Sequence, residues 1–172
     1  MNGLSLDIAG AAEQPVLANL LQFYVHDFSQ LFGGTSRCDL SDDGRYSIDI
    51  PLADWWQAPA HIPLLFRLDG ILAGFALLNA VTHSRLPADR NIAEFFVVRK
   101  YRRAGLGLAA AQALFTRYSG RWEAAVMRSN TGARNFWQHA ITRHPALADT
   151  HVADHNDSSW NGTIFRFVIS AS

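Results

Sequence analysis

The spacing of apolar residues along the chain predicts an alternation of helices and strands. Apolar residues three and four positions apart, the helical spacing, occupy residues 16–31, 106–118 and 131–140. Runs that are continuously apolar, or that alternate apolar and polar positions, occupy residues 45–50, 63–68, 71–80, 92–98, 122–127, 150–157 and 163–170. Asp69 and Gly70 form a strong two-residue turn between two of these runs. The order of elements predicts an α+β fold around a mixed sheet, closed by a hairpin that turns at residues 157–162.

Length and composition favour one globular domain over residues 1–172. Hydrophobic residues make up 49% of the chain and charged residues 17%, which is enough apolar surface for a sizeable core and argues against disorder. No internal repeat, low-complexity tract or linker divides the sequence. The formal net charge is zero, so we expect no nucleic acid as a partner.

Cysteine usage and the amino-terminal sequence predict a cytoplasmic protein. Cys38 is the only cysteine, which excludes an intrachain disulfide. The first ten residues lack the basic start of a signal peptide. The longest apolar run, residues 71–81, contains Gly74 and Asn79 and is too short to span a bilayer, so we expect no membrane partner.

The segment 92–118 has the pattern of an anion-binding site. An apolar strand is followed by a basic loop with glycines and then by a helix, whose first turn carries free N–H groups and partial positive charge. Gly105 and Gly107 have no side chain that would keep an anion away from the backbone. The loop also carries Arg99, Lys100, Arg102 and Arg103. The alternative is a tight turn at the glycines with a solvated rim of arginines.

Two motifs give this segment a family resemblance. The loop reads Arg102-Arg103-Ala104-Gly105-Leu106-Gly107, without the Gly-Lys-Ser/Thr of a Walker loop or the third glycine of a dinucleotide fingerprint. It resembles R-x-x-G-x-G, the pyrophosphate loop of the GNAT superfamily of N-acetyltransferases. Residues 130–137 resemble that family's second motif, N-x-x-A-x-x-F-Y. The order of the elements is also similar, so the resemblance covers most of the chain.

The resemblance implies acetyl-CoA as co-substrate, no metal, and α/β/α layers around a mostly antiparallel sheet that splays at the cofactor site. The pantetheine arm would pair with the backbone of residues 96–98, and the pyrophosphate would bind the N–H groups of residues 103–108. Asn130 would contact the arm or only cap its helix, and Ala133 would leave room for the arm or only pack. The implied binding residues are Phe96, Val97, Val98, Arg102, Arg103, Ala104, Gly105, Leu106, Gly107, Leu108, Asn130, Ala133 and Trp137.

The resemblance also implies direct attack of an amine on the thioester, which needs a base and an acid. Glu94 lies in an apolar strand where burial would raise its pKa, unless it is a strand-edge charge that reaches solvent. His83, in the preceding loop, is the second candidate base; otherwise it is a surface histidine. Trp137 stands where the family commonly has a tyrosine that acts as the general acid for the leaving thiolate. An indole N–H cannot donate a proton in this way.

Three functions remain open on the sequence. The first is transfer of an acetyl group to a small-molecule amine or a protein amino group; Asp42, Asp43 and Asp54 would favour a cationic acceptor, although acids are common in turns. The second is a non-catalytic acyl-CoA-binding module, and the third is an interaction protein with no CoA role. Aromatic residues of the closing hairpin could pack internally or across a homodimer.

Overall fold

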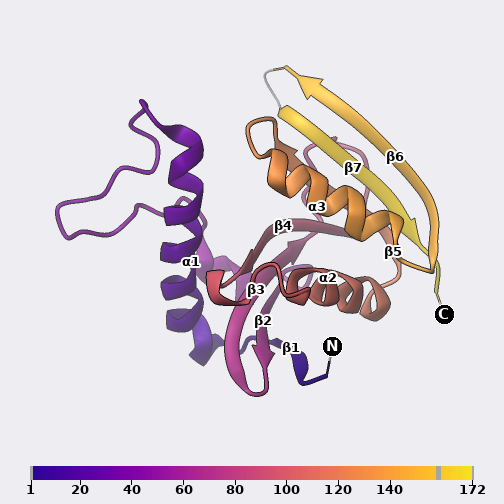
Figure 1. The fold of residues 1–172 in the computed structure, drawn as a ribbon, viewed down its shortest axis with the longest axis horizontal. Helices are drawn as coiled ribbons and strands as arrows, with labels where there is room; N and C mark the ends of the chain where they lie inside the picture. The colour runs from indigo at the N-terminus through magenta and orange to yellow at the C-terminus, as the bar shows by residue number, and fades with distance from the viewer. Residues whose placement is uncertain (1, 158–159, 172) are drawn as a thin grey trace.

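The computed structural model describes residues 2–157 and 160–171. Within this part of the chain, a seven-stranded sheet has the order β1-β2-β3-β4-β5-β7-β6 (Figure 1). The strands are β1 (Leu4–Ile8), β2 (Ile62–Leu68), β3 (Ile71–Asn79), β4 (Arg90–Val97), β5 (Gly120–Met127), β6 (Leu147–Asn156) and β7 (Asn161–Ile169). The helices are α1 (Gln14–Ser29), α2 (Leu106–Arg117) and α3 (Thr131–Thr142). Short 3-10 turns are η1 (Ala11–Glu13), η2 (Gln30–Phe32), η3 (Leu52–Trp56) and η4 (Arg99–Tyr101).

Successive apolar side chains of the strands point to opposite faces of the sheet, and helices cover both faces, which gives three layers. Leu64 and Phe66 of β2 belong to the core cluster that also contains the buried faces of α2 and α3. Leu65, between them, belongs to the cluster beneath α1 on the opposite face of the sheet. Successive side chains of a strand point to opposite faces, so a continuously apolar strand must be covered on both. Figure 1 shows α1 on one side of the sheet and α2 and α3 on the other. The predicted α/β/α arrangement is therefore confirmed.

One strand pair decides where a ligand can enter the sheet. Neighbouring strands are antiparallel except β4 and β5, which run parallel. These two pair only from Arg90↔Trp122 to Ile92↔Ala124, although both strands continue beyond these residues. Their carboxyl ends therefore diverge, as Figure 1 shows. The mixed, mostly antiparallel sheet with a splay between these strands is confirmed.

One strand prediction was wrong, and one strand was not predicted. Residues 45–50 form no strand; the backbone of Tyr46 instead bonds at both N–H and C=O to the side chain of Gln22, and Ile48 and Ile50 pack beneath α1. The first strand is β1, which pairs antiparallel with β2 and whose alternating sequence LSLDI was overlooked. The closing hairpin is confirmed as β6 and β7, while residues 158 and 159 of its predicted turn lie outside the described residues.

Candidate active site

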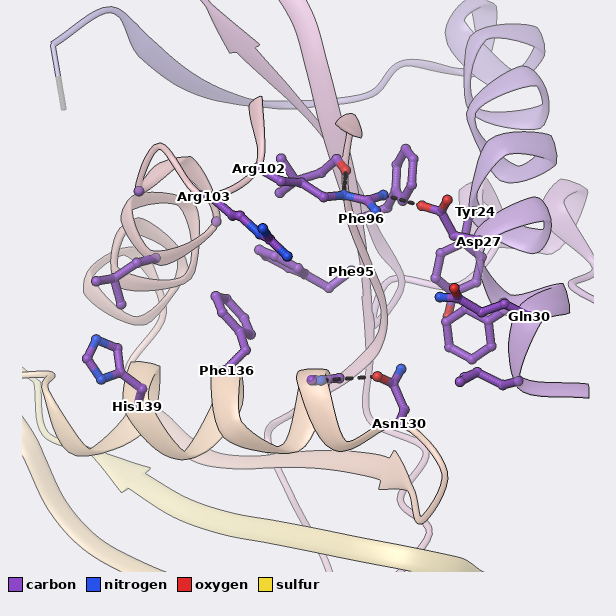
Figure 2. Close-up of a pocket in the computed structure, with 18 residues that line it drawn as sticks. Tyr24, Asp27, Gln30, Phe95, Phe96, Arg102, Arg103, Asn130, Phe136 and His139 are labelled. Atoms are coloured by element: carbon purple, nitrogen blue, oxygen red, sulfur yellow. Dashed lines mark hydrogen bonds and ion pairs between the residues drawn. The ribbon is translucent and has the colours of Figure 1, made fainter. Parts of the chain in front are cut away.

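The larger of two adjoining cavities opens between α1 and the helices on the other side of β4. Its volume is about 700 Å³. Figure 2 shows the loop arginines at one end, Tyr24 and Asp27 of α1 across from them, and Phe95 and Phe136 between. The lining residues are Tyr24, Asp27, Phe28, Gln30, Leu31, Phe95, Phe96, Val97, Arg102, Arg103, Gly105, Gly107, Leu108, Asn130, Gly132, Ala133, Phe136 and His139.

The glycine loop presents a row of free N–H groups to this cavity. Arg103 and Gly105 adopt left-handed backbone angles, with φ of 61° and 84°. Gly105 is the N-cap of α2, and its carbonyl accepts the Ala109 N–H at 3.0 Å. Among the described residues, no acceptor bonds the N–H groups of residues 103–108. Together with the helix dipole, these groups form a site that favours an anion. A different constraint favours glycine at position 107: a Cβ there would lie 3.3 Å from the Phe136 ring of α3.

Arg102 and Arg103, the two loop arginines that line the larger cavity, have different partners. Arg102 donates from Nε to the Val97 carbonyl at 2.7 Å and pairs through its Nη2 with Asp27 of α1. It therefore ties the loop to α1 across the mouth of the cavity (Figure 2). Arg103 extends over the cavity, and no described carboxylate lies within ion-pair distance of it. Arg103 is the guanidinium left available to an incoming anion.

Several predicted binding residues do not line the larger cavity. The Val98 N–H donates to the Ala73 carbonyl at 2.9 Å, so it is not free to pair with the pantetheine arm as predicted, and its side chain packs beneath α1. Ala104 is exposed outside the lining, and the Leu106 side chain is buried in the core, so Leu106 offers only its backbone. Trp137 is buried and borders the smaller cavity only.

The smaller cavity, of about 290 Å³, lies where β4 and β5 diverge. It shares five lining residues with the larger one, namely Tyr24, Phe28, Phe95, Asn130 and Ala133. Both predicted bases, Glu94 and His83, line it. The splay therefore places the glycine loop and both candidate bases around two adjoining cavities, which together are called the hollow.

Glu94 has a partner that the sequence did not reveal. The Tyr24 hydroxyl of α1 donates a hydrogen bond to Glu94 Oε2. Burial raises the pKa of Glu94 to about 7, although the hydrogen bond from Tyr24 acts in the lowering direction. Burial, and then the neighbouring Glu94 charge, raise the pKa of Tyr24 well above its usual value. A phenol on the apolar face of the predicted helix was the available indication of this pair.

His83 is held at the rim of the smaller cavity by its loop. Its N–H donates to Glu123 Oε1 at 2.6 Å, and its ring packs against Trp160 at 4.1 Å between centroids. Glu123 is fully buried and also accepts the Ser84 N–H and hydroxyl, so one carboxylate anchors the loop. Burial lowers the pKa of His83, only partly offset by the Glu123 charge, which leaves the ring neutral at pH 7.

Asn130 caps α3, which is one of its two predicted roles. Its Oδ1 accepts the Ala133 N–H at 3.1 Å, the bond of a helix N-cap. Its side chain also borders both cavities, beside Ala133 (Figure 2). The cap holds Asn130 in one orientation, so its amide NH₂ is left to contact a ligand.

The model of the acetyltransferase (GNAT) family matches residues 22–141. This chain belongs to the GNAT acetyltransferase family. The matched region runs from α1, across the splayed strands and the glycine loop, to the end of α3. The residues that line both cavities therefore lie almost entirely within the family region. No curated protein matches the sequence.

Solved structures of GNAT acetyltransferases share the fold at low sequence identity. A GNAT acetyltransferase from Streptococcus agalactiae has a TM-score of 0.66 at 14% identity, over 99% of this chain and 98% of that one. An acetyltransferase from Thermus thermophilus has a TM-score of 0.62 at 16% identity, over 96% and 95%. RimL, a ribosomal L7/L12 alpha-N-protein acetyltransferase in complex with coenzyme A, has 0.59 at 14%, over 100% and 97%.

Membrane-spanning helices and metal-binding groups are the last two features to consider in the described residues. None of their helices combines the length and the apolar character needed to cross a membrane. They also contain no group of three or more His, Cys, Asp or Glu placed to hold a metal ion.

Proposed function

We propose that this GNAT acetyltransferase transfers an acetyl group from acetyl-CoA to a primary amine, by direct attack in a ternary complex. One observation carries the proposal: the glycine loop, with its free N–H groups, and Glu94 line two adjoining cavities that share five lining residues. Acetyl-CoA has matching chemistry, an anionic pyrophosphate at one end of a long arm and a thioester at the other. The coenzyme A bound in the RimL structure supports this choice of ligand.

The residues present fit acetyl-CoA. The N–H groups of residues 103–108, with the unpaired Arg103, would hold the pyrophosphate. Phe96 and Val97 would flank the arm where β4 leaves β5, with Asn130 and Ala133 on the other side. When bound, acetyl-CoA would supply an activated acetyl group. The apolar lining would exclude water, so that the amine rather than water meets this group.

Glu94 and Tyr24 would move the protons. With a pKa of about 7, Glu94 is partly ionised at neutral pH and basic enough to take a proton from an ammonium group. Tyr24 borders both cavities, so its hydroxyl can reach the sulfur side of the hollow. It would give its proton to the departing sulfur and recover one from Glu94. The ammonium group loses two protons in the reaction: the first would leave through Glu94 to solvent before the attack, and the second would pass from the attacking nitrogen through Glu94 and Tyr24 to the thiol. Tyr24 would thus supply the acid that Trp137 cannot provide. His83 remains the alternative base.

A single-turnover assay tests the function. With protein in excess over acetyl-CoA, a panel of primary amines should release free thiol faster than buffer alone, and the acetylated amine should be detected by mass spectrometry. Thermal-shift titration with acetyl-CoA runs beside it, because a ligand that binds the native state raises the midpoint. A midpoint rise without thiol release from any amine would leave a non-catalytic acyl-CoA-binding module. If acetyl-CoA does not raise the midpoint, both the acetyltransferase function and the acyl-CoA-binding module are overturned.

Replacing Tyr24→Phe separates proton transfer from packing. The ring and its aromatic contacts stay, but kcat should fall by about 10²-fold because the acid is lost. The hydrogen bond from Tyr24 lowers the pKa of Glu94, so its removal should move the acidic limb of the kcat profile to higher pH. Tyr46→Phe, whose hydroxyl contacts His26 outside the hollow, is the control. An unchanged kcat and an unmoved limb would exclude Tyr24 from the chemistry.

A further inference from the structure

The walls of the smaller cavity are mainly aromatic. Five of its lining residues are Phe, Tyr or Trp, and they come from α1, β4, α3 and the position just before β7: Tyr24, Phe28, Phe95, Trp137 and Trp160. Ala93, Ala125 and Val126 add further apolar surface. An apolar group gains free energy in such a site, and an ammonium group is attracted to the faces of its rings. The walls therefore suit a cation attached to an apolar body.

The charged side chains that line this cavity are negative only. Glu94 is the only lining residue with a charged side chain, and no lysine or arginine lines the cavity in the described part of the chain. His83 is neutral at pH 7 because burial lowers its pKa. Two arginines of neighbouring segments are engaged elsewhere: Arg102 pairs with Asp27, and Arg166 donates to the Pro87 carbonyl and approaches Glu123. One negative charge matches one ammonium group.

This balance excludes several common acceptors. A carboxylate on the carbon next to the amine would enter the cavity without a cation to pair with, and a desolvated unpaired charge is strongly disfavoured. A polyamine would bring a second ammonium group that finds no second carboxylate. A volume of about 290 Å³ leaves little room for a large polar acceptor.

We propose that the acceptor is a primary monoamine carried on an apolar body with no anionic group near the nitrogen. Two sources share this chemistry, a free aralkylamine and an apolar amino-terminal residue of a polypeptide, whose carboxyl is an amide. The inference rests on the proposed function, since it assigns the acceptor of the same site.

Matched amines test it on the intact protein with acetyl-CoA. Phenylalaninamide carries a neutral amide where phenylalanine carries a carboxylate. With each rate expressed per unprotonated amine, kcat/KM should be at least about 100-fold higher for the amide, which corresponds to about 2.7 kcal/mol. Phenethylamine should be accepted, and spermidine and glycine should be poor substrates. A peptide amide that begins with phenylalanine distinguishes the sources. Turnover equal to that of phenylalaninamide indicates a polypeptide acceptor, and turnover at least tenfold lower indicates a free amine.

A variant ties the selectivity to the cavity. Met127, the last residue of β5, lines the cavity and is half-buried. Met127→Lys places a cation there and should narrow the preference for phenylalaninamide over phenylalanine at least tenfold, while Met127→Leu should keep it. Equal use of phenylalanine and its amide by the natural protein, or a preference for spermidine, would overturn the inference but leave the acetyltransferase function. Failure of every amine to release thiol would instead overturn the proposed function.

Discussion

Glu94→Gln is expected to lower kcat by about 10²–10⁴-fold, the usual contribution of a positioned general base. Glutamine has nearly the same shape and can still accept the Tyr24 hydroxyl, so the packing around the pair should survive. The natural protein should lose activity as the pH falls through about 7, where Glu94 becomes protonated, and the variant should lack this limb. Steady-state kinetics from about pH 5.5 to about pH 9, which spans both sides of that pKa, provide the measurement.

The same substitution should change the pH dependence of stability. The folded state raises the pKa of Glu94 from 4.5 to about 7, so between these values the native state binds more protons than the unfolded state. Stability then falls as the pH rises through this window, and Glu94→Gln should flatten that fall. The control for both measurements is Glu13→Gln, because Glu13 is a partly exposed carboxylate that pairs with Arg67 and lines neither cavity. A Glu94→Gln variant with nearly full kcat would place the base elsewhere, with His83→Asn as the next test.

Gly105→Glu is expected to abolish acetyl-CoA binding. Gly105 has φ of 84°, which strains any L side chain, and a carboxylate there would take the place of the pyrophosphate at the start of α2. In the natural protein, ligand at about 100 times Kd should stabilise the native state by about 2.7 kcal/mol. For a chain of this size that raises the midpoint by roughly 5–10 °C. The variant should show no rise at the same concentration of acetyl-CoA.

Gly70→Glu separates strain from electrostatics. Gly70 lies in the turn between β2 and β3 with φ of 79°, and no atom lies within 4 Å of a Cβ built there. This variant should be destabilised to a similar extent, because the backbone strain is alike, yet it should keep the full shift with acetyl-CoA. If both variants lose the shift, or if both retain it, the glycine loop is not the anion site.

Features that depend on neighbouring residues could be predicted from the sequence. The strand before the loop, the loop glycines and the start of α2 follow one another within residues 92–118, so their pattern indicates an anion site before any fold is known. The hairpin at Asp69 and Gly70 is equally local. Residues 45–50 show the limit of this reasoning, because an alternating pattern cannot tell pairing with a strand from packing beneath a helix.

What the sequence by itself determined is the family, the layered fold and the segment that is the candidate anion site. Only the tertiary structure decided which groups surround the reacting end of the hollow. Tyr24 meets Glu94 across 70 positions of the chain, and Arg102 turns from the loop to Asp27 across 75. Such pairs depend on how α1 packs against β4 and on where β4 leaves β5. No local pattern encodes that packing, because it results from burial summed over the whole sheet.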